Sequence, residues 1–145
     1  MSQLAQKLAS YENRFKNHQK QVDQFFETAK VAFNTEYFPS IKVTRAEDDK
    51  GQLSALGMRY ELDFRFVVLA DGPTTLLEVS LPATAHTGKE RLALWYVDSL
   101  GNVRTDPNNS FSTANVDEKS FLIELVDKAQ QAYFALVKKT LPTIQ

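Results

Sequence analysis

The amino-acid sequence predicts an α+β fold with a long N-terminal helix, a four- to five-stranded antiparallel meander and a C-terminal helix, both helices packing on one face of the sheet. Apolar residues recur with a helical period near both ends of the chain and with a period of two between them. The connections between the expected strands are short, which favours antiparallel pairing because parallel pairs need long crossovers. We expect one domain over residues 1–145, with a helix at about 3–33, strands at about 40–106 and a helix at about 116–139.

The first helix is predicted by an apolar stripe in a region that contains neither glycine nor proline. The stripe has a 4-3-4-3 spacing, close to the heptad pattern of helices that pack along a seam. Its members are Leu4, Leu8, Tyr11, Phe15, His18, Val22, Phe25 and Ala29. Ser2 can cap the start of the helix, and Asn34 and Pro39 are expected to end it.

The strands are predicted from about Ile41 onward, where apolar and polar residues begin to alternate. The stretch AEDDKGQ indicates a turn, and one long strand is expected from about Leu53 to Leu69, ending before Gly72. Strands are then expected at TLLEVSL and RLALWYV, separated by the loop PATAHTGKE. The stretch DSLGN predicts a hairpin into a short last strand.

The C-terminal helix is predicted by a second apolar stripe. Its main members are Leu122, Leu125, Ala129, Ala132 and Leu136. Asn115 and Glu118 resemble a capping box before it, although asparagine replaces the usual serine or threonine. Lys138 and Lys139 suit the negative end of the helix dipole, and Pro142 prevents the helix from continuing.

The long strand alternates apolar and charged residues, so its charged face is a candidate site. Arg59, Glu61, Asp63 and Arg65 share that face, because residues two apart on a strand point the same way. Two neighbouring carboxylates can serve as acid and base or hold a metal. Each, however, has an arginine two positions away, which favours two ordinary ionised carboxylates. We therefore interpret the charged set as the exposed face of the sheet. The opposite set is expected beneath the helices: Met58, Tyr60, Leu62, Phe64 and Phe66.

Composition and motifs argue against several function classes. The formal net charge of −1 offers no electrostatic attraction to nucleic acid or anionic membranes, and the absence of cysteine excludes thiolate chemistry. The stretch ATAHTGK lacks the first glycine and the hydroxyl residue of a phosphate-binding loop, with Ala83 and Glu90 at those positions. We predict no catalytic, cofactor or metal site. No signal peptide or membrane span is recognisable, so a cytoplasmic location is expected.

The strand RLALWYV is apolar on both faces, which indicates that both faces are covered. One interpretation is a central strand beneath a loop that carries Phe111. The other is an exposed patch around Trp95 that binds a ligand or a partner. The residues of this candidate surface are Trp95, Val97, Phe111, His86 and Lys89.

Three hypotheses about function remain open. The first is a non-catalytic protein–protein interaction or adaptor module that forms a homodimer. Its first helix, at about 46 Å, would be longer than a body of roughly 38 Å. The predicted dimer contact is formed by Leu4, Leu8, Tyr11 and Phe15. The second is a small apolar-ligand binding protein with a pocket between helix and curved sheet. The third is an enzyme with an unrecognised site.

Overall fold

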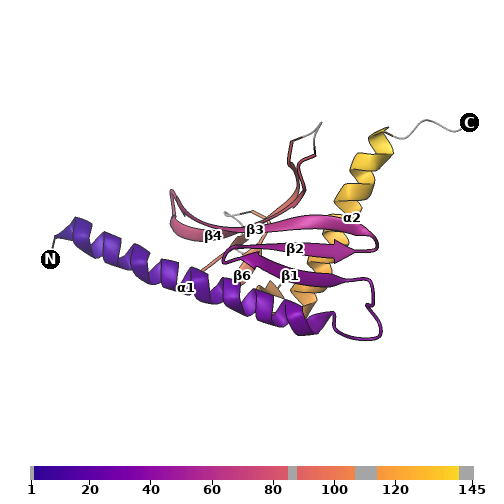
Figure 1. Cartoon of the computed structure of the whole chain (residues 1–145). Coiled ribbons are helices and arrows are strands. Elements are labelled where there is room, and N and C mark those ends of the chain that lie inside the picture. Colours follow the sequence, from indigo (N-terminus) through magenta and orange to yellow (C-terminus); the bar gives the residue numbers. More distant parts are fainter. Residues whose placement is uncertain (1, 85–87, 107–113, 141–145) are drawn as a thin grey trace, which may run out of the picture.

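The structure of the chain is a computed structural model that describes residues 2–84, 88–106 and 114–140 (Figure 1). Two α-helices flank an antiparallel sheet of seven strands, so the α+β prediction is confirmed. In chain order the elements are α1 (Gln3–Ala32), β1 (Lys42–Glu47), β2 (Lys50–Ala55), β3 (Met58–Leu69), β4 (Gly72–Leu81), β5 (Glu90–Val97), β6 (Asn102–Arg104), β7 (Ala114–Asn115) and α2 (Lys119–Thr140).

The prediction of four to five strands was wrong, and the main reason is a turn at Leu56 and Gly57. This turn divides the expected strand from Leu53 to Leu69 into β2 and β3, and Ala55 pairs with Met58 across it. Both turn residues have positive φ, 52° at Leu56 and 84° at Gly57. Leucine rarely adopts that conformation, so the sequence carries no ordinary turn signal there. The two-residue strand β7, in a region expected to be an irregular link, completes the seven.

The strands lie in the sheet in the order in which they occur in the chain, from β1 at one edge to β7 at the other. Every neighbouring pair is antiparallel, as the short connections predicted. Figure 1 shows α1 running along the curved sheet and α2 standing at the end of the sheet farther from the N-terminus of α1. Both helices contact the same face, since Phe64 of β3 meets α1 and Trp95 of β5, two strands away on that face, meets α2.

Aromatic rings fill the space between the helices and the sheet. Phe25 of α1 lies 5.0 Å from Phe64, and Phe121 of α2 lies 5.5 Å from Trp95, as measured between ring centroids in edge-on arrangements. Tyr60, Leu62 and Phe64 are buried on the helix-facing side of β3, as the alternation predicted. Met58 and Phe66, at the two ends of that set, are half-buried. Burial of such side chains contributes about 1.5–3 kcal/mol each to stability.

Helix α1 is continuous and extends well beyond the sheet. Its 30 residues correspond to about 45 Å, and the Ser2 side chain accepts a hydrogen bond from the Ala5 amide at 3.1 Å, as expected for the N-cap. The buried residues of α1 begin only at His18. The N-terminal turns of α1 therefore project past the body of the molecule (Figure 1), whereas Phe15 already meets Phe66 of β3.

Candidate functional site

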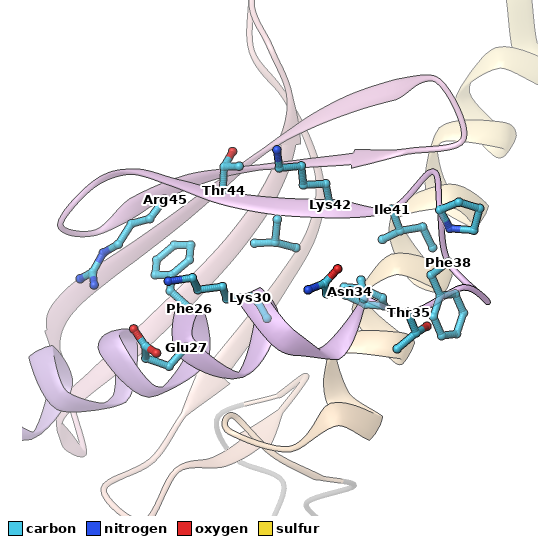
Figure 2. Close-up of a pocket in the computed structure, with 14 residues that line it drawn as sticks. Phe26, Glu27, Lys30, Asn34, Thr35, Phe38, Ile41, Lys42, Thr44 and Arg45 are labelled. Carbon is cyan, nitrogen blue, oxygen red and sulfur yellow. The ribbon is translucent and has the colours of Figure 1, made fainter.

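A groove of about 770 Å³ lies between the second half of α1, the connection that follows it, and the edge strand β1. Its apolar lining comes from all three segments: Phe26, Ala29, Phe33, Phe38, Ile41 and Val43. Figure 2 shows Phe26 and Lys30 rising from α1 toward β1, with Phe38 and Ile41 at the far end. The connection holds its place because the Phe38 ring meets the Phe33 ring edge-on, with centroids 5.6 Å apart.

The Phe26 ring reaches the sheet because the residue opposite it is glycine. A Cβ atom added to Gly51 in β2 would lie 2.5 Å from the Phe26 ring and 2.6 Å from the Thr44 carbonyl oxygen. A glycine inside a strand commonly marks such a close approach. Gly51 thus allows α1 to pack closely beneath β1 and β2. This contact closes one end of the groove.

The rim of the groove is predominantly cationic. Lys30, Lys42 and Arg45 line it, against the single carboxylate of Glu27. Arg45 is held in place, since its guanidinium lies 2.7 Å from an Asp23 carboxylate oxygen and 5.1 Å from the centre of the Phe26 ring. Lys30 and Lys42 are exposed, and neither forms an ion pair with any residue that the structure describes. This local positive charge contrasts with the net charge of −1 for the chain.

A second candidate surface is the exposed part of the α1 stripe. Leu4 is 67% exposed, Leu8 55% and Phe15 38%, whereas Tyr11 is half-buried. The same stripe is buried further along, where His18, Val22 and Phe25 face the sheet. We call Leu4, Leu8, Tyr11 and Phe15 the overhang stripe. Its members are the residues predicted for a dimer contact. Leu4 and Leu8 lie on the projecting N-terminal turns of α1, and Phe15 lies where the helix meets Phe66 of β3.

The other predicted surface is not formed in the described part of the chain. Trp95 and Val97 are buried on the helix-facing side of β5, where α2 covers Trp95 through Phe121. The interpretation of an exposed patch around Trp95 was therefore wrong, because a helix covers this face. Lys89 does not belong to this face, since its ammonium nitrogen lies 3.2 Å from a carboxylate oxygen of Glu61 on the charged face of β3. His86 and Phe111 lie outside the described residues.

The charged face of β3 is less exposed than the alternation predicted. Arg59 and Arg65 are exposed and Glu61 is half-buried, but Asp63 is only 8% exposed. Asp63 stands opposite Glu78 of β4 and accepts a hydrogen bond from the Arg65 guanidinium at 3.2 Å. The expectation of a mostly exposed Asp63 was therefore wrong, because its side chain lies between the neighbouring strands β2 and β4. Asp63 is paired with Arg65, as expected, whereas Glu61 is paired with Lys89 and not with an arginine.

Arg91 completes this cluster from β5. It donates a hydrogen bond to the buried Glu78 carboxylate at 2.9 Å, and Arg65 lies 3.7 Å from the other oxygen of that carboxylate. Two carboxylates and two guanidiniums thus alternate across β3, β4 and β5. Both buried carboxylates of this cluster thus have an arginine partner.

His18 is the one buried imidazole among the described residues. Its Nδ1 atom lies 2.9 Å from the Thr75 hydroxyl, and its Nε2 atom lies 3.6 Å from an Asp49 carboxylate oxygen. Burial lowers the pKa of His18 below its usual value of 6.5, and Arg14 adds to this effect while Asp49 opposes it. Phe15 and Phe66 stack around the ring. A packed histidine in the α1 seam is what the sequence predicted.

Comparisons of the chain with protein-family models, with curated proteins and with solved structures find no significant match. Neither described helix combines the length and the apolar character needed to cross a lipid bilayer. Across residues 2–84, 88–106 and 114–140, no three acidic or histidine side chains converge as metal ligands. Any inference about the groove and the overhang stripe therefore rests on their geometry alone.

Proposed function

We propose that the chain is a non-catalytic protein-binding module that forms a homodimer through the overhang stripe. We base this proposal on the position of the stripe, which continues the core-facing side of α1. Phe15 at its inner end meets Phe66 of β3, whereas Leu4 and Leu8 at its outer end are largely exposed. Large apolar groups at heptad spacing are typical of helices that pack against another helix. A second copy offers the same stripe, and twofold dimers are the commonest oligomers.

The exposed fractions of these side chains allow an estimate of the free energy that their burial would contribute to dimer formation. Leu4, Leu8 and Phe15 together expose the equivalent of one to two large side chains per chain. Burying them in a twofold contact would contribute roughly 5–10 kcal/mol over both copies. Association itself costs about 4 kcal/mol or more. We therefore expect a reversible dimer with a dissociation constant in the micromolar range or weaker.

Sedimentation equilibrium over a range of concentrations tests this proposal. The wild-type mass should rise from 16.4 kDa toward twice that value, and the double variant Leu4→Asp/Leu8→Asp should remain monomeric. Val31→Asp is a matched control, because Val31 is an equally exposed apolar residue on the covered half of α1. A wild-type mass that stays at the monomer value up to millimolar concentration would contradict the proposal.

The second candidate function is binding of a small apolar ligand, and the groove beside β1 is the observation that favours it. Its volume of about 770 Å³ lies in the usual range of ligand sites, roughly 300–1,000 Å³. The ligand would lie in this groove, since aromatic rings fill the interior between the helices and the middle of the sheet. Saturable, one-to-one uptake of a fatty acid or an apolar dye, lost in a Phe38→Ala variant, would support this candidate.

A further inference from the structure

The groove runs beside a strand whose outer edge pairs with no other strand in the described part of the chain. β1 pairs with β2 on one side only, and five of its six residues are exposed. In an antiparallel ladder, every second residue of an edge strand directs its N–H and C=O groups away from its neighbour. β1 thus presents backbone donors and acceptors along the groove. At the opposite edge, two residues of β7 are described.

We propose that β1 binds an extended peptide segment of another protein, in which apolar and acidic residues alternate, as an additional antiparallel strand. This mode of recognition combines main-chain hydrogen bonds to a sheet edge with pockets for alternate side chains. The proposal concerns a surface separate from the overhang stripe, so it does not depend on the proposed homodimer.

The side chains of β1 account for the apolar half of this pattern. Val43 pairs with Leu53, which pairs with the buried Tyr60, so Val43 lies on the helix-facing side of the sheet. Ile41, two residues earlier, lines the same groove. Every second side chain of an added strand would point to this side, at spacings of about 7 Å. Those side chains would meet Phe26, Phe38 and the apolar residues of β1, and they should therefore be apolar.

The remaining positions of the added strand account for the acidic half. Lys42 pairs with Ser54, which pairs with the exposed Arg59, so Lys42 lies on the outer face of the sheet. A carboxylate on the added strand, directly opposite Lys42, would form an oppositely charged pair that stabilises the strand pairing. Lys30 lines the groove from α1, on the helix-facing side, so it adds positive charge beside the strand but does not lie on the face of Lys42. Neither lysine forms an ion pair within the described residues. Carboxylates of the peptide would pair with Lys42, which has no ion-pair partner among the described residues.

Fluorescence anisotropy with labelled synthetic peptides tests the proposal. The probe is a seven-residue peptide in which valine and glutamate alternate, and a control peptide replaces each glutamate by lysine. A third peptide carries N-methyl groups on alternate residues, which removes its hydrogen-bond donors along one edge. The first peptide should bind saturably at one per chain. The lysine peptide should bind at least about tenfold more weakly, and the N-methylated peptide should lose binding.

Variants of the protein locate the site. Lys30→Glu/Lys42→Glu should weaken binding of the glutamate peptide about tenfold and strengthen binding of the lysine peptide, since attraction becomes repulsion. Lys128→Glu, which changes an exposed lysine on α2, should leave both affinities unchanged. The measurements are repeated in the Leu4→Asp/Leu8→Asp background, so that failure of the homodimer proposal and failure of this one remain distinguishable.

Three results would overturn the proposal. The first is absence of saturable peptide binding up to millimolar concentration. The second is equal binding of the N-methylated peptide, or displacement of the peptide by a fatty acid that binds more tightly, because either shows an apolar pocket and not a strand edge. The third is a dimer that persists in the Leu4→Asp/Leu8→Asp variant and dissociates on Lys30→Glu/Lys42→Glu, because a second copy of the chain would then occupy β1.

Discussion

Replacing Gly51 by alanine is expected to destabilise the protein, because the added Cβ atom has no room. It would lie 2.6 Å from the Thr44 carbonyl oxygen and 2.5 Å and 2.8 Å from two atoms of the Phe26 ring. The carbonyl belongs to the paired strand β1, so it cannot move without disturbing the register. Overpacking of this kind costs about 1–3 kcal/mol. For a chain of this length, a loss of about 2 kcal/mol lowers Tm by about 4–8 °C.

Urea denaturation followed by circular dichroism measures this loss. Gly88→Ala serves as control, because a Cβ atom at Gly88 meets nothing within 4 Å, and its effect should stay within about 0.5 kcal/mol. In a Phe26→Leu background the cost of Gly51→Ala should be smaller, since the nearest ring atoms are removed. A Gly51→Ala variant as stable as the wild type would refute the close packing of α1 on β2, and with it the shape of the groove.

Three further outcomes are expected. Phe64→Ala should lower the free energy of unfolding by about 3–5 kcal/mol in urea titrations, whereas Arg59→Ala on the exposed side of the same strand should change it by less than about 0.5 kcal/mol. Leu56→Asn should raise the melting temperature, because asparagine tolerates the positive φ of 52° better than leucine, while Leu100→Asn at another exposed leucine should not. The lowered pKa of His18 means that the unfolded chain takes up a proton below about pH 6.5 before the folded chain does, so wild-type stability should fall from pH 7 to pH 5, and His18→Gln should reduce that slope. A stability that is constant over this pH range in the wild type would show that His18 is not buried in its neutral form.

The sequence predicted best the elements in which a regular apolar pattern continues over many residues. α1 has an uninterrupted stripe with Ser2 before it, and the expected helix at about 3–33 is found as Gln3–Ala32. β3 alternates over twelve residues, which places Leu62 and Phe64 beneath the helices without reference to any neighbour. In both cases the pattern within one segment determines the orientation of its side chains.

The features that were missed depend on residues far apart in the chain. Nothing around Trp95 indicates that Phe121 of α2 will cover it, so a patch and a core position look alike in the sequence. The groove likewise joins Phe26 to Val43 through the packing at Gly51. Its nearest sequence signal is the apolar pair Phe38 and Ile41 in a short connection, where polar residues would be usual. The burial of Asp63 was not predicted because it depends on the neighbouring strands, where Lys50 and Glu78 stand opposite it.

The meander also has a consequence for the order in which the molecule assembles. Successive hairpins can form the sheet from local contacts, which generally favours rapid folding. α1, by contrast, precedes all its partners in the chain, because Phe25 packs against Phe64 in β3 and then lies near Phe121 in α2. During synthesis its entire apolar stripe emerges before any strand that can cover it. The nascent chain is therefore most prone to aggregation before β3 and β4 have left the ribosome. Slower translation after α1, until β4 has emerged, would prolong that interval.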